Sequence, residues 1–160
     1  MAKLLNIITD PNPILRRKSV EISHEELSSD KIQQLIADMT KTMEERDGVG
    51  LAAPQVGENI RLIVVNAKNE MVAMINPKIT KKSWARAIEE EGCLSIPLTF
   101  GSVERHRKIN CVFLDFSGKE KKLYLSGLDA RAVQHEIDHL DGILFIDKAK
   151  HIHVVNEDQN

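Results

Sequence analysis

An HExxH motif at residues 135–139 constrains the structure of this 160-residue chain more than any other feature. Residues 128–140 carry apolar side chains at helical spacing, so the motif is predicted to lie on a helix. Residues four apart share one face of a helix, and His135 and His139 can therefore bind one divalent metal ion. The side chain of Glu136 points away from that face, so it does not bind the ion. From its position it can instead reach a water molecule bound to the ion. The motif thus predicts a metal-dependent hydrolase.

Such a metal site needs a third protein ligand, and the sequence offers several candidates. The metzincin pattern would place another histidine at Phe145, so it fails. The thermolysin pattern needs a downstream helical glutamate, but Glu157 lies in a polar tail. Cys93 follows a glycine in a turn-prone segment and is the best upstream candidate, with His106 as a competitor in a charged, solvated segment. Cys111 lies in an alternating strand pattern and is expected to be a buried structural cysteine.

The composition fits a chain that builds its own core and does not need a metal for stability. Hydrophobic residues make up 42% and charged residues 29% of the sequence, and at this length about two-thirds of the unfolded surface can be buried. The 22 basic and 24 acidic residues give a net charge of -2, which argues against specificity for nucleic acid or attraction to a membrane. Two cysteines and no visible export signal predict a cytoplasmic protein, expected to be a monomer.

The remaining pattern predicts one α+β domain over residues 1–160, with small mixed or antiparallel β-sheets packed around a central HExxH helix and an N-terminal amphipathic helix. The expected regular elements are a helix at 28–46, antiparallel strands at 60–65 and 71–75, and a hairpin of 109–116 with 122–125. The segments expected to be irregular are an arm at 1–25, a small apolar loop at 48–57 and a short, loose tail at 148–160, and residues 78–92 form a polar stretch. Gln55 is the only polar side chain of the apolar loop, which is expected to line a site.

Three motifs, in order along the chain, resemble those of the peptide deformylase family. They are GVGLAAPQ at 48–55, EGCLS at 91–95 and QHEIDHL at 134–140. The similarity extends from about residue 10 to about residue 147. The resemblance implies a hydrolase that removes the formyl group from the N-terminal formylmethionine of newly made proteins, which would be its partners.

The resemblance also implies a metal site and a catalytic group. Cys93, His135 and His139 would hold one divalent metal ion, with Fe²⁺ expected and Zn²⁺, Ni²⁺ or Co²⁺ as substitutes in a purified sample. Glu136 would act as general base and then as general acid.

Five positions are implied to contact the substrate. The Gln55 side chain and the backbone N–H of Leu94 would stabilise the oxyanion. The Gly50 carbonyl would accept the formamide N–H, while Val49 and Leu128 would wall the methionine pocket.

The chain departs from the family pattern at two places. Many bacterial members carry an arginine near the position of Phe100, and many end in a long charged helix associated with transient ribosome contact, whereas this chain stops soon after Asp147. Two other functions are considered: a small HExxH metallopeptidase that cleaves internal peptide bonds, and a non-catalytic metal-binding domain of the translation machinery.

Overall fold

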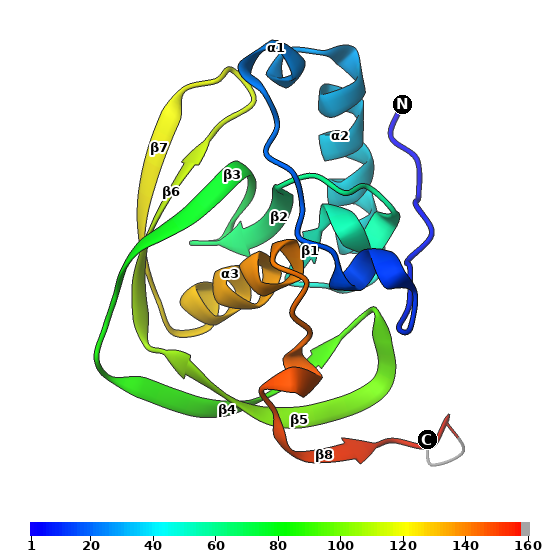
Figure 1. Cartoon of the computed structure of the whole chain (residues 1–160), viewed down its shortest axis with the longest axis vertical. Helices are drawn as coiled ribbons and strands as arrows, with labels where there is room; N and C mark the ends of the chain where they lie inside the picture. The colour runs from blue at the N-terminus through cyan, green and yellow to red at the C-terminus, as the bar shows by residue number, and fades with distance from the viewer. Residues whose placement is uncertain (158–160) are drawn as a thin grey trace.

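A computed structural model describes residues 1–157 as two antiparallel sheets with a helix between them (Figure 1). One sheet has the strand order β1-β2-β3-β6-β7 and the other has the order β4-β5-β8. The strands are β1 Gly50–Ala52, β2 Leu62–Ala67, β3 Glu70–Lys82, β4 Arg86–Cys93, β5 Ile96–His106, β6 Lys108–Leu114, β7 Glu120–Ser126 and β8 Lys150–Val154. The helices are α1 His24–Leu27, α2 Asp30–Glu45 and α3 Gly127–Leu140, with short 3-10 turns η1 Pro13–Arg16, η2 Ala53–Val56 and η3 Phe145–Asp147. This is the α+β class that the sequence predicts.

Helix α2 forms where the apolar spacing predicts it. The Ser29 side chain accepts a hydrogen bond from the backbone N–H of Ile32 and caps the N-terminus. The buried side chains of α2, among them Leu35, Met39 and Met43, pack against β1 and β2. None of the helices described in residues 1–157 has the length and apolar character that crossing a lipid bilayer requires.

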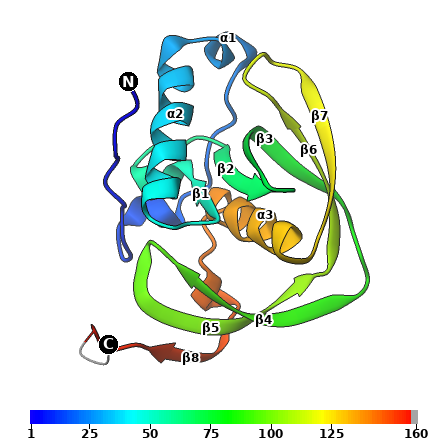
Figure 2. The same cartoon turned by 180° about the vertical axis from the view of Figure 1, so that it is seen from behind.

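Helix α3 lies between the two sheets in both views (Figures 1 and 2). Val133, Ile137 and Leu140 pack in one core cluster with side chains of the five-stranded sheet. Burial of each such side chain contributes about 1.5–3 kcal/mol, so this packing fixes the height and rotation of the helix. Cys111 belongs to the same cluster, and burial raises the pKa of its thiol to about 12. It is therefore the inert structural cysteine that its strand pattern predicts.

Two segments predicted to be irregular, and the polar stretch 78–92, form strands or turns. Residues 48–57 contain β1 and η2, because β2 supplies backbone partners to the small apolar residues there. The polar stretch 78–92 is divided between β3 and β4, whose exposed side chains hide the strand signal. The segment 150–154 is not loose, because it pairs with the free edge of β5 as β8. Residues 158–160, the end of the predicted tail, lie outside the described part of the chain.

Candidate active site

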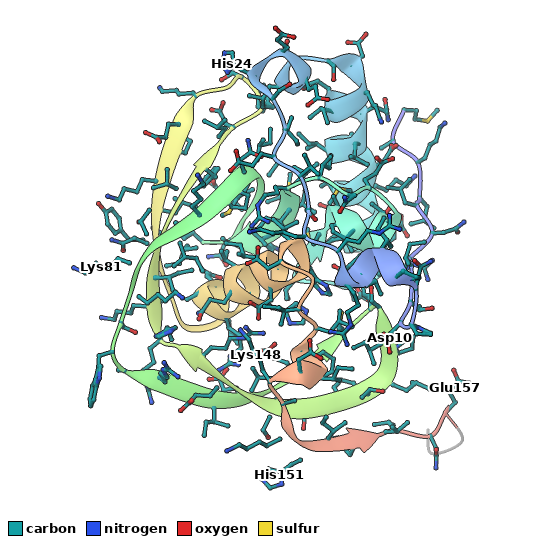
Figure 3. The ribbon with its side chains drawn as sticks, viewed as in Figure 1. Asp10, His24, Lys81, Lys148, His151 and Glu157 are labelled. Atoms are coloured by element: carbon teal, nitrogen blue, oxygen red, sulfur yellow. The ribbon has the colours of Figure 1, made fainter. Side chains whose placement is uncertain are left out.

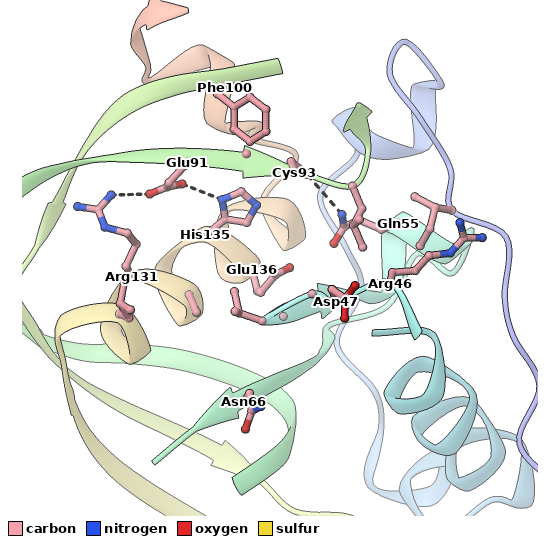
Figure 4. A pocket seen from close by; sticks show the side chains of 18 of the residues that line it. Arg46, Asp47, Gln55, Asn66, Glu91, Cys93, Phe100, Arg131, His135 and Glu136 are labelled. Carbon is pink, nitrogen blue, oxygen red and sulfur yellow. Dashed lines mark hydrogen bonds and ion pairs between the residues drawn. The ribbon is translucent and has the colours of Figure 1, made fainter. Parts of the chain in front are cut away.

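Two elements bring three candidate metal ligands together. Two of them, Cys93 and His135, line a pocket (Figure 4). Cys93 ends β4 at a tight turn into β5, and His135 and His139 lie one helical turn apart on α3. One ligand atom from each of the three lies within 4.8 Å of the others. The Cys93 Sγ is 3.3 Å from the His139 Nε2. The predicted ligands thus meet, whereas the competitor His106 lies elsewhere, with its Nδ1 2.7 Å from the Ser83 carbonyl oxygen.

A buried carboxylate orients the first histidine. The Glu91 Oε1 is 2.8 Å from the Nδ1 of His135, which directs the other ring nitrogen, Nε2, toward the cluster. Carboxylate partners of this kind fix the tautomer of metal-binding histidines. Arg105 binds the same carboxylate through two nitrogens at 2.9 Å, and Arg131 binds it at 2.6 Å. Although burial opposes ionisation, the hydrogen bonds from Arg105 and His135 hold the pKa of Glu91 well below its usual range.

The electrostatics of the cluster suit a cation. Burial lowers the pKa of His135, but the Cys93 thiol and Glu91 outweigh burial and raise it to about 10. Burial lowers the pKa of His139 well below its ordinary value, so that imidazole is neutral. One sulfur and two imidazole nitrogens are the donors of tetrahedral sites for zinc and similar divalent ions, and metal binding displaces protons from such donors. The residues present therefore fit a divalent metal ion.

Glu136 lies beside this cluster but is not part of it. Its side chain is buried, and its Oε2 has no hydrogen-bond partner among residues 1–157. Burial raises the pKa of Glu136 to about 7. The opposite wall is Gly50, where an added Cβ would lie 2.7 Å from the Glu136 Oε1. A glycine at this position therefore gives the carboxylate its space.

Gln55 approaches the cluster from the side of η2. Its Oε1 accepts a hydrogen bond from the backbone N–H of Ala52, so the orientation of the amide is fixed. Its Nε2 is 3.4 Å from the Cys93 Sγ and donates to the Ser95 Oγ at 3.1 Å. The one polar side chain of the apolar segment thus presents N–H groups toward the predicted metal ligands.

The pocket has a volume of about 1260 Å³, and every other predicted substrate-contacting residue lines it. Leu94 lies in the turn after Cys93, and Gly50 begins β1. Val49 is 66% exposed and Leu128 is 74% exposed, which leaves apolar surface free for an apolar ligand side chain. The pocket can therefore hold a small peptide-like ligand beside the cluster.

The sequence interpretation missed the three charged groups that support His135. Residues 104–108 are predicted to be solvated, but Arg105 is only 4% exposed and its ion pair with Glu91 is buried. The prediction is wrong for Arg105 because alternate residues of β5 face the interior. Glu91 lies inside the EGCLS motif, and Arg131 lies one turn before His135 on α3. This closeness in sequence to the predicted metal ligands is the signal that could have identified both residues.

Comparison with known proteins agrees with the geometry. The model of the family described as "Polypeptide deformylase" matches residues 4–154. The chain belongs to this family. The peptide deformylase of Desulfotalea psychrophila is 41% identical over 150 residues, covering 90% of this chain and 86% of the relative. The peptide deformylase of Symbiobacterium thermophilum is 44% identical over 159 residues, covering 97% of this chain and 71% of the relative.

The fold of a solved deformylase is also similar. The crystal structure of the class I type b peptide deformylase from Acinetobacter baumannii, bound to Met-Ala-Ser, superposes with a TM-score of 0.89 and 37% identity. The match covers 92% of this chain and 99% of that deformylase. Similarity to deformylases therefore extends over nearly the whole fold.

Proposed function

We propose that the pocket hydrolyses the formyl amide of the N-terminal formylmethionine of newly synthesised proteins. The buried Glu136 carboxylate beside the Cys93, His135 and His139 cluster is the observation that carries this proposal. Family membership supports it, since the A. baumannii deformylase is bound to a peptide whose first residue is methionine. The corresponding formylated peptide is the proposed substrate.

Cys93, His135 and His139 would hold one divalent ion. Such an ion, when bound, supplies Lewis acidity and lowers the pKa of a water at its open position toward neutrality. Zn²⁺ binds sites of this type more tightly than Fe²⁺. The resemblance to deformylases nevertheless favours Fe²⁺ as the working metal.

Protein loaded with Fe²⁺ under argon is expected to turn over formyl-Met-Ala-Ser faster than the same protein loaded with Zn²⁺. The comparison requires metal content measured by mass spectrometry, with equal loading in both samples. A chelator should abolish turnover, and added metal should restore it. Equal rates for the two loaded forms would refute the assignment of iron.

Glu136 is the proton carrier. Its carboxylate accepts a proton from the attacking water as the water oxygen bonds to the formyl carbon. It returns that proton to the amine nitrogen as the carbon–nitrogen bond breaks, so the products are formate and a free N-terminal amine. A carboxylic acid with a pKa raised to about 7 by burial is suited to both transfers near neutral pH.

The N–H groups of the Gln55 amide and of the Leu94 backbone stabilise the oxyanion of the tetrahedral intermediate. The Gln55 amide is preorganised, because the Ala52 N–H holds its oxygen. Donors fixed before the reaction need no reorganisation when charge develops, and this makes them effective.

Gln55→Ala is expected to lower kcat on formyl-Met-Ala-Ser by about a hundredfold or more, because it removes one oxyanion donor. KM and metal content should change little. Gln33→Ala, which removes an exposed glutamine side chain on α2, is the control and should retain full activity. A Gln55→Ala protein with wild-type kcat would exclude this role.

The substrate peptide is proposed to lie along β1. This strand forms one edge of the five-stranded sheet, and edge strands can pair with an extended peptide. The Gly50 carbonyl accepts the formamide N–H, while Val49 and Leu128 cover the methionine side chain. Burial of their exposed apolar surface on binding would favour an apolar first residue.

A substrate formed at the ribosome places the proposed activity in the cytoplasm. Transient contact with the ribosome would bring the pocket close to emerging N-termini.

Formate release from formyl-Met-Ala-Ser tests the proposed function directly. We expect metal-dependent formate production with no cleavage of the Met-Ala or Ala-Ser bonds, measured by a coupled formate assay and by mass spectrometry of the peptide. Cleavage of internal bonds without formate would instead identify a metallopeptidase. Absence of both reactions in the metal-loaded protein would leave only a non-catalytic metal-binding domain.

A further inference from the structure

One half of the five-stranded sheet has an outer face that no helix of residues 1–157 covers. Helix α3 packs on the inner face, and α2 covers the outer face over β1 and β2 and the adjoining part of β3. Farther along the sheet, β3, β6 and β7 lie at the left of the molecule in Figure 1. Many of their outer side chains are exposed. We call this area the basic face and define it by Lys78, Lys81, Lys108, Lys122 and Tyr124.

Strand register places these five residues on one surface. Lys78 pairs with Val112, and Val112 pairs with Lys122, so the two lysines flank β6. Two residues before Val112 on β6, Asn110 pairs with Lys81 on one side and with Tyr124 on the other. Two residues earlier still, Lys108 pairs with Ser126. Directly paired residues of antiparallel strands project from the same side of a sheet. Lys81 points away from the sheet into solvent in Figure 3.

The basic face concentrates charge that the net charge conceals. Register places four lysines on this face, Lys78, Lys81, Lys108 and Lys122, against one acidic residue of these strands, Glu120, which projects from the same side of β7 as Lys122. Lys78 also forms an ion pair with Glu21 at 3.6 Å. Lys81, Lys108 and Lys122 have no carboxylate within 4.0 Å in the described part of the chain. The remainder of the protein is correspondingly acidic. The fold thus separates the charges and produces a local positive field.

Two exposed aromatic side chains accompany these lysines. Tyr124 is 62% exposed, and the Lys122 Nζ lies 5.7 Å from the centre of its ring. Trp84, in the connection from β3 to β4, is 98% exposed. Aromatic rings beside basic groups on a sheet surface stack on unpaired nucleobases while the lysines contact phosphates.

We propose that the basic face binds single-stranded RNA without strong sequence preference. The polar residues between the lysines, Thr80, Asn110 and Ser126, can hydrogen-bond to phosphate and ribose groups. No residue of the face lines the pocket, so RNA and peptide can bind together. The proposal concerns binding alone and does not depend on the proposed hydrolysis.

Fluorescence anisotropy of a labelled, unstructured RNA of about 20 nucleotides tests the proposal with the full-length, metal-loaded protein. At about 50 mM salt we expect micromolar affinity that weakens as salt increases. Lys81→Glu/Lys122→Glu should weaken binding at least tenfold and reduce the salt slope by about one to two. Tyr124→Ala and Trp84→Ala should each weaken binding about tenfold. Peptide deformylation should remain at the wild-type level in all of these variants.

Lys18→Glu/Lys41→Glu is the matched control, because it makes the same change of charge at exposed lysines outside the basic face. This control should lose little RNA affinity beyond the effect of net charge. Equal loss in both double variants, or no RNA binding at low salt, would overturn the proposal. Binding to phosphatidylserine vesicles in preference to the RNA would overturn it as well.

Discussion

Replacing Glu136 by glutamine is expected to reduce kcat/KM on formyl-Met-Ala-Ser by about two to four orders of magnitude. The amide keeps the shape of the side chain in the space that Gly50 leaves open, but it cannot accept a proton. Positioned acid–base groups typically contribute this much to rate. Metal content should be unchanged, since Glu136 is not among the clustered ligand atoms.

The free energy of unfolding separates this loss from misfolding. The Glu136 Oε2 is buried without a hydrogen-bond partner in residues 1–157, which makes an ionised carboxylate costly at this position. Glu136→Gln should therefore be as stable as the wild type or more stable. Glu45→Gln, at the exposed end of α2, is the matched control and should keep wild-type activity. If Glu136→Gln keeps full activity with metal bound, the carboxylate has no part in catalysis.

The two long helices could be predicted because their signals are local. The apolar spacing of residues 128–140 and of residues 28–46 reports which face of each helix is buried, and a serine precedes the start of α2. The hairpin of β6 and β7 has a similarly local turn. Strands β4, β5 and β8 could not be predicted in the same way. Many of their side chains are polar, and β8 finds its partner about fifty residues earlier in the chain.

In the candidate site too, the residues with a local sequence signal could be predicted and the others could not. The pair His135 and His139 follows from helical geometry, and Cys93 follows from elimination of other ligands and from the family resemblance. The ion pairs of Glu91 could not be predicted from the sequence, because Arg105 and Arg131 are separated from it by 14 and 40 residues. The net charge of -2 likewise says nothing about where the charges lie. Only the strand register gathers the lysines of the basic face on one surface.

The buried ion pairs around Glu91 predict the second large effect. Glu91→Gln is expected to lower the free energy of unfolding by about 3 kcal/mol, since removal of one partner leaves buried charges uncompensated. Arg105 and Arg131 direct three N–H donors at this carboxylate, and the glutamine NH₂ would face some of them. Chemical denaturation monitored by circular dichroism measures the change.

The same substitution should weaken metal binding by about ten- to a hundredfold, because the His135 ring loses the acceptor that fixes its tautomer. Competition with a chromophoric chelator measures this affinity independently of turnover. Glu90→Gln is the matched control, since the Glu90 carboxylate is exposed and its one ion pair within residues 1–157 is with His153, at 3.9 Å. Exposed pairs contribute at most about 1 kcal/mol, so this control should unfold and bind metal almost as the wild type does. Identical stability and metal affinity in the two variants would mean that the Glu91 ion pairs neither stabilise the fold nor orient His135.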